Sequence, residues 1–334
     1  MFFKDKKILI IGGTGTIGQS LVKHILKEQP KLIRILSRDE YKQFHLQNKL
    51  GNQNNLQFLI GDVRDYDRVV SALEDIDYVF HVAAMKHVPT CEYNPYEAVQ
   101  TNINGTYNVI KAASAQNVKK VVFTSSDKAI SPTNTYGATK LIAERLISSA
   151  QYSNGRINTT FASVRFGNVM GSRGSVIPLF IRQILKNKKV TVTNLKMTRF
   201  MMTLNQATSL TIKALQESKG GEVFVLKMPV ITLKDMVKVV IEQTCKKYNL
   251  NSSEIKIEEI GLRLGEKMYE ELMTYDESTI AWELPEMFII PGIREEKSSY
   301  LNARVASYGT YSSDSHPPIS IEEIKTIILS ENLI

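Results

Sequence analysis

Cysteine is scarce in this chain of 334 residues, which contains only Cys91 and Cys245. The two lie far apart and lack metal-ligand spacing, so we expect neither a disulfide framework nor a metal site. No apolar run approaches the roughly 18 residues that a membrane-spanning helix needs. The first residues also lack the apolar segment and the cleavage site of a signal peptide. We therefore expect a soluble protein of the cytoplasm with reduced thiols.

Clustered basic residues are also lacking, although the formal net charge is +8. No block rich in Lys and Arg is interleaved with aromatic residues, so we do not expect nucleic acid as a partner. The scattered charges indicate a solvated surface, and a basic cleft for an anionic substrate is the alternative. Internal repeats and low-complexity tracts are absent. The length suits one large α/β domain with a smaller appended part.

Glycines are concentrated near the N-terminus, directly after the apolar run 7–11. Gly13, Gly15 and Gly18 fit the pattern G-x-G-x-x-G, while Gly12, Gly15 and Gly18 fit G-x-x-G-x-x-G. Residues 19–26 then have the apolar spacing of a helix. A strand, a glycine loop and a helix in this order are typical of a dinucleotide site. The glycines allow a tight turn and let a pyrophosphate approach the helix N-terminus.

Strands alternate with helices through the first half of the chain. Apolar runs predict strands at residues 7–11, 32–36, 56–60, 77–84, 119–124 and 159–165, with a helix over about 95–117 among those between them. This pattern predicts an α/β fold with a doubly wound parallel sheet of the Rossmann type. Beyond residue 166 the pattern loosens, with a strand near 190–192 and a helix over 206–217. We therefore predict a cofactor-binding domain over 1–166 and a mainly substrate-binding part over 167–334, which is free to cross back to the sheet.

The second predicted strand ends in Ser37 and Arg38, where sites that prefer NAD tend to place an acidic residue. A Ser and an Arg suit the 2′-phosphate of NADP instead. Asp39 and Glu40 follow, and we expect them to open the next helix. The ends of the third and fourth strands offer further candidates for contact with the cofactor, namely Asp62, Ala83 and Ala84. We therefore predict NADP as the cofactor.

Tyr136 and Lys140 follow the fifth predicted strand and begin a helical pattern. Their spacing of four places them on one helix face. A neighbouring cation lowers the pKa of a phenol, which would let Tyr136 take a proton from an alcohol near neutral pH. The ordinary alternative is a Tyr and a Lys at helical spacing without a catalytic role.

Asp127 and Lys128 lie at the carboxyl end of the same strand, where parallel sheets bind ligands. We expect burial to raise the pKa of Asp127, and burial together with Lys140 to lower the pKa of Lys128, whereas an ion pair between the two would work the other way and favour both charged forms. Adjacent residues on a strand point to opposite faces, so we expect a loose pair unless the backbone turns. The ordinary alternative is a solvated or capping pair.

These motifs resemble the extended short-chain dehydrogenase/reductase superfamily. A finer set is similar to the UDP-N-acetylglucosamine 4,6-dehydratases, at residues 37–40, 61–65, 83–89, 126–129, 136–140, 167–176, 197–200 and 265–267. The similarity is greatest to the short soluble group that inverts C5. Larger relatives carry transmembrane helices, and several relatives have Met in place of Tyr136. The resemblance covers about residues 5–275, with modest departures at Val82 and Ser126.

The resemblance implies a hydro-lyase that forms a UDP-2-acetamido-2,6-dideoxy-4-hexulose for bacterial surface polysaccharide or glycan synthesis. It also implies tightly bound NADP that is regenerated in its oxidised form in each turnover. Tyr136, assisted by Lys140, would take the proton of the sugar O4. Lys128 would remove the C5 proton, and Asp127 would protonate the departing C6 hydroxyl. The family also suggests a homo-oligomer, often a hexamer.

The resemblance implies two sets of contacts. The cofactor residues are Gly12, Thr14, Gly15, Thr16, Ile17, Gly18, Ser37, Arg38, Asp62, Val63, Ala83, Ala84, Lys86, Tyr136 and Lys140. The UDP-sugar residues are Lys86, His87, Lys128, Asn168, Arg173, Arg199, Arg263 and Glu266. From residue type alone, a diphosphate clamp would need Arg173, Arg199, Arg263 or Lys267 to converge, and each could equally be a surface base.

Three alternatives stay open. A nucleotide-sugar C4 epimerase would need Tyr136 and Lys140 but not Asp127 and Lys128. A dehydratase could instead retain C5 or release the 5,6-ene. A protein of another class would bind the dinucleotide as a sensor without catalysis, although the intact Tyr136 and Lys140 argue against it.

Overall fold

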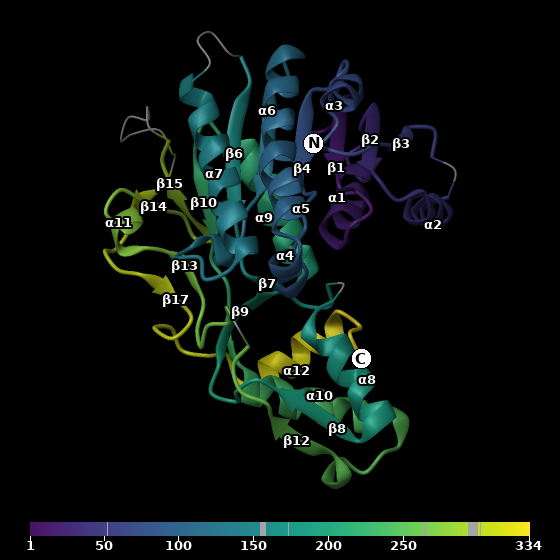
Figure 1. Cartoon of the computed structure of the whole chain (residues 1–334), viewed down its shortest axis with the longest axis vertical. Helices are drawn as coiled ribbons and strands as arrows, with labels where there is room; N and C mark the ends of the chain where they lie inside the picture. The colour runs from purple at the N-terminus through teal and green to yellow at the C-terminus, as the bar shows by residue number, and fades with distance from the viewer. Residues whose placement is uncertain (52, 154–157, 173, 264, 293–299, 301) are drawn as a thin grey trace.

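The apolar runs of the first half form adjacent strands of one large sheet in the computed structural model, which describes all residues except 52, 154–157, 173, 264, 293–299 and 301. Its strands are β1 (Lys7–Ile11), β2 (Leu32–Ser37), β3 (Leu56–Ile60), β4 (Tyr78–His81), β5 (Lys120–Thr124), β6 (Thr160–Arg165), β10 (Val223–Leu226), β14 (Trp282–Glu283), β15 (Met287–Ile290) and β16 (Arg304–Val305). The order is β16-β14-β15-β10-β6-β5-β4-β1-β2-β3. From β3 to β10 the strands are parallel, and β15, β14 and β16 extend the sheet in antiparallel fashion. The predicted doubly wound parallel sheet is therefore confirmed (Figure 1).

Helices cover both faces of this sheet. They are α1 (Thr16–Leu26), α2 (Glu40–Leu50), α3 (Tyr66–Leu73), α4 (Val88–Tyr93), α5 (Pro95–Ala98), η1 (Val99–Asn104), α6 (Gly105–Ala115), α7 (Thr135–Ser153) and α9 (Leu204–Glu217). Successive strand residues point to opposite faces, so Ile8 and Ile10 join one core while Leu9 and Ile11 join another. The first core includes residues of α1 and α9, and the second includes residues of α3, α6 and α7.

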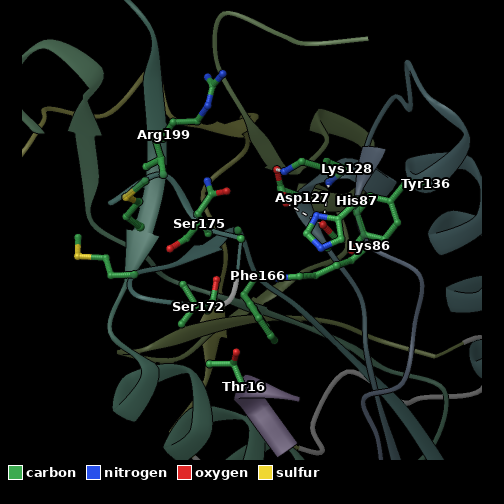
Figure 2. Close-up of a pocket in the computed structure, with 18 of the residues that line it drawn as sticks. Thr16, Lys86, His87, Asp127, Lys128, Tyr136, Phe166, Ser172, Ser175 and Arg199 are labelled. Atoms are coloured by element: carbon green, nitrogen blue, oxygen red, sulfur yellow. Dashed lines mark hydrogen bonds and ion pairs between the residues drawn. The ribbon is translucent and has the colours of Figure 1, made fainter. Parts of the chain in front are cut away.

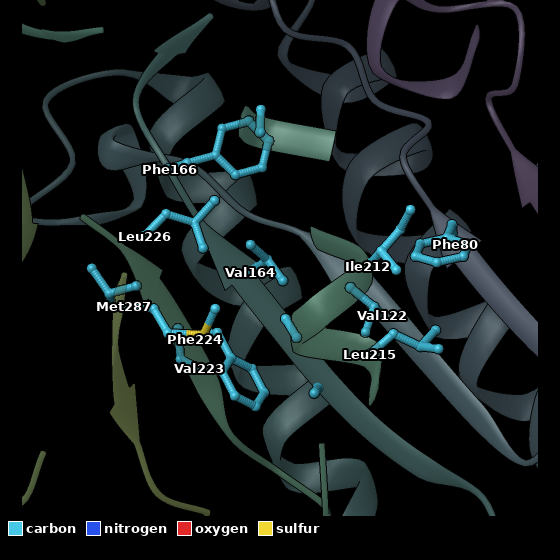
Figure 3. Packing of buried hydrophobic residues seen from close by; sticks show 14 of the residues in the cluster. Phe80, Val122, Val164, Phe166, Ile212, Leu215, Val223, Phe224, Leu226 and Met287 are labelled. Atoms are coloured by element: carbon cyan, nitrogen blue, oxygen red, sulfur yellow. The ribbon is translucent and has the colours of Figure 1, made fainter. Parts of the chain in front are cut away.

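The core under α9 joins the two halves of the chain. Val122 and Val164 of the first half pack with Phe224 of β10 and with Ile212 and Leu215 of α9 (Figure 3). Residues beyond 166 therefore complete the Rossmann layers as well as forming a separate part. The boundary at residue 166 stays a prediction about where the two binding roles divide.

The remaining elements form a smaller part at the lower end of the molecule in Figure 1 and a lateral group beside the large sheet, in which two strands pair only with each other. The smaller part contains β7 (Asn168–Val169), α8 (Val176–Asn187), β8 (Lys189–Val192), β9 (Thr198–Met202), β11 (Val230–Thr232), α10 (Leu233–Tyr248), η3 (Ser252–Glu254), β12 (Lys256–Glu259) and α12 (Ile321–Ser330). Phe180, Ile184, Val237 and Ile324 belong to its own hydrophobic core. The lateral elements are β13 (Glu271–Met273), α11 (Tyr275–Ser278) and β17 (Tyr311–Ser312).

A buried ionic cluster connects the first half to the lateral elements. Arg165, which is fully buried, contacts Glu144 of α7 at 2.5 Å and Glu277 of α11 at 2.9 Å. Its guanidinium also donates to the carbonyl of Leu272 at 2.8 Å. A buried charge is tolerated when it is paired and hydrogen-bonded in this way.

The predicted helical segment over about 95–117 is confirmed, because α5, η1 and α6 together run from Pro95 to Ala115, and its middle part, η1, is a π-helical segment. Its Asn102 accepts a hydrogen bond from the backbone amide of Met85 and donates one to the carbonyl of the same residue. Wider helical turns of this kind are frequent at functional sites. Within the described part of the chain, no helix combines the length and the apolar character needed to cross a bilayer.

Candidate active site

A cavity of about 760 Å³ lies at the carboxyl edge of the sheet, between the sheet and the smaller part of the molecule. Its lining comes from the glycine loop, the segments after β4 and β5, the start of α7, the loop before α8, and strands β8 and β9. The carboxyl edge is where parallel α/β sheets bind ligands. Figure 2 shows Lys86, His87, Lys128 and Tyr136 gathered on one side of this cavity, with Thr16 at another end.

The glycine loop packs too closely to accept side chains at two positions. A Cβ at Gly12, whose φ is +89°, would lie 2.7 Å from the backbone nitrogen of Ala83. A Cβ at Gly18 would lie 2.5 Å from the carbonyl oxygen of Gly12. Gly15 caps α1 without a side-chain hydrogen bond, so the helix N-terminus faces the cavity with backbone groups. This arrangement fits a dinucleotide pyrophosphate.

The other predicted cofactor residues divide into two groups. Thr16, Ile17, Ala84, Lys86, Tyr136 and Lys140 line the cavity together with Gly12, Gly15 and Gly18. The remaining ones do not: Thr14, Ser37, Arg38, Asp62, Val63 and Ala83. Among these, Val63 is buried against Gly105, and Ala83 contributes its close backbone contact with Gly12.

The end of β2 carries no acidic side chain directed at a cofactor ribose. The Ser37 hydroxyl accepts a hydrogen bond from Gln43 at 2.9 Å, and Arg38, 55% exposed, lies 3.7 Å from Asp62. Asp39 caps α2 by accepting a hydrogen bond from the amide of Lys42 at 3.0 Å. Asp39 thus opens the next helix, as predicted.

Asp127 and Lys128 lie in a short 3-10 turn, η2 (Asp127–Ala129), and not on the strand. The backbone therefore turns here, which is the exception to opposite-facing side chains that the sequence left open. The turn lets the Lys128 ammonium donate to the Asp127 carboxylate at 2.7 Å. Ser126 caps the turn and donates to the other carboxylate oxygen of Asp127 at 2.8 Å.

Both pKa values shift in the direction that an ion pair favours, and opposite to the direction that burial favours. Burial opposes the charge of Asp127, but the Lys128 ammonium and its hydrogen bond outweigh burial and lower the pKa of the carboxyl. Burial likewise opposes the charge of Lys128, but Asp127 and Glu270 outweigh it and raise the pKa of the ammonium. The resting site therefore holds an ion pair, because each charge compensates the other.

Tyr136 and Lys140 lie one turn apart on α7, as predicted, but their effects on each other differ from the prediction. Burial raises the pKa of Tyr136, and the opposing contributions come from a hydrogen bond with Ser126 and from the charge of Lys128. Lys140 donates to the carbonyl of Thr124 at 2.5 Å and lies over the ring of Phe123. Burial lowers the pKa of Lys140 to about 7. Near neutral pH Lys140 can therefore hold or release a proton within the site.

The predicted substrate residues that line the cavity are Lys86, His87, Lys128, Asn168, Arg199, Arg263 and Glu266. Arg173 lies outside the described residues. The guanidinium of Arg199 already donates to the carbonyls of Thr198, Met268 and Lys267, at 2.8, 3.1 and 3.0 Å. Lys267 donates to the carbonyl of Ile130 and is not part of the lining. Of the candidate residues for a diphosphate clamp that the structure describes, Arg199 and Arg263 thus line the cavity and Lys267 does not.

Three polar residues that the sequence analysis did not single out for a role organise the site. Asn102 holds the backbone of Met85 and donates to Thr139 at 3.0 Å. Ser126 contacts both Asp127 and Tyr136. Glu270, which follows the motif at residues 265–267, contacts Asn168 and Arg199. The sequence indicated Ser126 and Glu270 only by their positions. Ser126 lies within the segment 126–129 that carries the family resemblance, and Glu270 lies shortly after the segment 265–267.

The protein-family model for a polysaccharide biosynthesis protein matches residues 8–292. The chain belongs to this family. The chain is similar to three relatives over most of their length. An uncharacterized membrane protein of Methanocaldococcus jannaschii is 50% identical over 86% of either chain. A UDP-glucose 4-epimerase of Rickettsia bellii is 40% identical over 98% of this chain and 96% of its own. A UDP-N-acetylglucosamine 4,6-dehydratase (inverting) of Campylobacter jejuni is 38% identical over 96% of both.

A solved structure also resembles this member of the polysaccharide biosynthesis protein family. The X-ray structure of Pen from Bacillus thuringiensis superposes with a TM-score of 0.95 at 64% identity and covers 100% of both chains. The family and the topology together place the chain among extended short-chain dehydrogenase/reductase folds. The relatives carry both dehydratase and epimerase names, so the reaction has to be argued from the site.

Proposed function

We propose that this protein is a nucleotide-sugar 4,6-dehydratase that converts UDP-N-acetylglucosamine to a UDP-2-acetamido-2,6-dideoxy-4-hexulose with inversion at C5. The observation that carries the proposal is the ion pair of Asp127 and Lys128 beside Tyr136 in the lining of one cavity. Oxidation at C4 requires only a base for the O4 proton. Elimination of water requires a second base and an acid, and the pair supplies both.

The ion pair reaches its reactive form by one proton transfer. If the Lys128 ammonium gives a proton to Asp127 across 2.7 Å, the amine becomes a base and the carboxyl becomes an acid. The number of protons and the net charge of the pair do not change, and a site of low dielectric favours two neutral groups over two charged ones, so the exclusion of water promotes the transfer. The shifted pKa values show which form dominates at rest, and bound substrate has to favour the other form.

The remaining steps use this pair together with Tyr136 and Lys140. Burial keeps the Tyr136 phenol protonated at rest, so it must first lose its own proton, for which Lys140, with a pKa of about 7, is the proposed acceptor. Tyr136 then takes the O4 proton as C4 becomes a ketone. Lys128 removes the C5 proton, which the ketone has acidified, and Asp127 protonates the C6 hydroxyl as it leaves as water. A proton then returns to C5, and C5 inverts when this proton arrives on the face opposite to the one that lost it.

The glycine loop, Tyr136 and Lys140 fit a nicotinamide dinucleotide, which we propose is NADP. The fit rests on the close packing of Gly12 and Gly18, on the uncapped N-terminus of α1, and on Arg38 at the end of β2. When bound, the dinucleotide would accept a hydride from C4 and return one to C6. Arg38 is exposed and lies 3.7 Å from Asp62. Its guanidinium could turn from Asp62 towards a bound 2′-phosphate.

The second candidate is a C4 epimerase, because a relative 40% identical to this chain carries that name. Such an enzyme would use Tyr136 and Lys140 but would leave the Asp127–Lys128 pair without a role. The buried position of Asp127 and its two hydrogen bonds therefore favour the dehydratase.

One experiment separates the candidates. The protein is incubated with UDP-N-acetylglucosamine in heavy water and followed by proton NMR. A new C6 methyl group with deuterium at C5 supports the dehydratase, and the coupling constants among the protons at C1, C2 and C3, which depend on the ring conformation, report inversion or retention. A C4 epimer without solvent deuterium would replace the proposal by the epimerase. An unchanged substrate would favour the sensor or another nucleotide sugar. The cytoplasmic location, the homo-oligomer and the UDP-sugar partner stay predictions.

A further inference from the structure

Glu270 is a buried carboxyl group behind the cavity wall, with a side chain only 9% exposed. It does not line the cavity, but three residues that do line it point to its carboxylate. Asn168 donates to its two oxygens at 3.0 and 2.9 Å. The Arg199 guanidinium lies 3.4 Å away, and the Lys128 ammonium lies 3.7 Å away. The backbone amide of Phe200 also donates to it at 3.1 Å.

The Lys128 ammonium therefore lies between two carboxylates on different parts of the chain. Asp127 belongs to the same turn, whereas Glu270 directly precedes β13. The other ionisable group that acts on Lys128 is Tyr136. The charged groups that act on Glu270 are Asp127, Lys128 and Arg199. Two anions around one ammonium favour its charged form, and Arg199 offsets part of this effect.

We propose that Glu270 is a positioning residue that holds the Lys128 ammonium beside Asp127 and favours its protonated form. The consequence for turnover rests on the proposed dehydratase function, but the effect on Lys128 does not. Glu270 acts through Lys128, Asn168 and Arg199, because these side chains reach the cavity and Glu270 does not. Its contacts with Asn168 and Phe200 alone would give a purely structural role, which would leave the titration of Lys128 unchanged.

The test is the pH dependence of the chemical reactivity of Lys128, measured on the whole protein without substrate. Trace acetic anhydride labels neutral amines, and mass spectrometry of peptides gives the labelling rate of Lys128 from roughly pH 7 to 11. Because the pKa of Lys128 is raised, this range lies on the rising part of its titration, so the labelling midpoint is defined here as the pH at which the rate reaches half of the wild-type rate at pH 11. Lys128 is accessible to the reagent, since its side chain is 32% exposed. Glu270→Gln keeps the size of the side chain and removes its charge. We expect the midpoint of labelling to move about one pH unit lower.

Glu271→Gln is the matched control, because Glu271 is the next residue and pairs with Lys267 at 3.5 Å, away from Lys128. We expect the wild-type midpoint in this variant. Glu270→Asp withdraws the carboxylate by one methylene, and we expect a smaller decrease in the same direction. If Glu270→Gln does not fold, as judged by circular dichroism, the Asp variant decides. An unchanged midpoint in the folded variant, or an equal decrease in Glu271→Gln, would overturn the proposal.

A second measurement connects Glu270 to turnover. Because the pair acts while it holds one proton, the falling limb of kcat/KM at high pH should move lower in Glu270→Gln by the same amount as the labelling midpoint, and stay in place in Glu271→Gln. A fall in kcat with no movement of this limb would indicate a structural role and overturn the link. A wild-type protein that does not dehydrate UDP-N-acetylglucosamine would refute the proposed function, and the labelling result would still decide the role of Glu270.

Discussion

Gly137 lies directly against the backbone carbonyl of Lys128, and a Cβ at this position would overlap the carbonyl oxygen. The first turn of α7 and the turn that carries Asp127 and Lys128 are thus in contact through a position that accepts only hydrogen. We expect Gly137→Ala to displace η2 and to lower the rate of elimination at least tenfold, because small displacements of catalytic groups are costly. Measured C6-methyl formation checks this, and an unchanged rate in a folded Gly137→Ala variant would contradict it.

Tyr136→Phe keeps the buried ring and removes the hydroxyl that takes the O4 proton. We expect kcat to fall by about 10²–10⁴, the usual contribution of a positioned general base. The exposed Tyr93 provides the matched control, and Tyr93→Phe should keep wild-type turnover. Near-normal turnover in Tyr136→Phe would assign the base to another group, with Asp127 first.

Lys128→Ala should allow oxidation at C4 and prevent loss of the C5 proton. Given UDP-N-acetylglucosamine, this variant should accumulate the absorbance of reduced nicotinamide, with little deuterium at C5 and no 6-deoxy product. Stopped-flow absorbance and proton NMR measure the two halves separately. Wild-type formation of the 6-deoxy product by Lys128→Ala would leave only the oxidation half of the mechanism.

Arg38→Asp should reverse the cofactor preference. The change removes a charge-assisted contact with a 2′-phosphate, which is worth roughly 1.5–3 kcal/mol, and adds an acceptor for ribose hydroxyls. Titration calorimetry with NADP and NAD measures both affinities without any turnover. The assignment fails if the wild type binds NAD more tightly or if the variant leaves both affinities unchanged.

Lys140→Met should stabilise the cofactor-free protein while it removes activity. Burial lowers the pKa of Lys140 from its ordinary 10.5 to about 7, so between these values the unfolded chain binds more protons than the folded one. Folding therefore carries the full cost of the buried charge below pH 7, and this cost decreases as the pH rises towards 10.5. The gain in Lys140→Met, about 1.4 kcal/mol per unit by which the pKa is lowered, should be largest at low pH. Thermal denaturation at pH 6 and pH 9 checks the difference, and an equal gain at both values would refute it.

The sheet, the glycine loop and the helix that carries Tyr136 and Lys140 were predictable, because each depends on local periodicity and on glycine positions. The strand runs at residues 7–11 and 56–60 match β1 and β3 at both ends. The helical segment over about 95–117 was predictable as well, but its π-helical part was not, and there Asn102 contacts the backbone of Met85, which lies 17 positions earlier. Sequence periodicity does not indicate such a contact.

The electrostatics of the site were not predictable from neighbouring residues. The state of Lys128 depends on a turn that brings Asp127 to the same side, and on Glu270 from 142 positions further along the chain. The state of Tyr136 depends on burial and on Ser126, where the spacing to Lys140 suggested another cause. The protonation states of Lys128 and Tyr136 both depend on which groups lie close in space within a site of low polarity.

The ionic cluster of Arg165, Glu144 and Glu277 also limits where the chain can be divided into parts that fold separately. A polypeptide that ends at residue 166 would keep Arg165 and Glu144 but lose Glu277 and the carbonyl of Leu272. It would also leave β6 as an unpaired edge, because β10 is its neighbour. Split-protein fusions, domain exchange with relatives and co-translational folding should therefore all depend on synthesis continuing to about residue 290, where β15 ends.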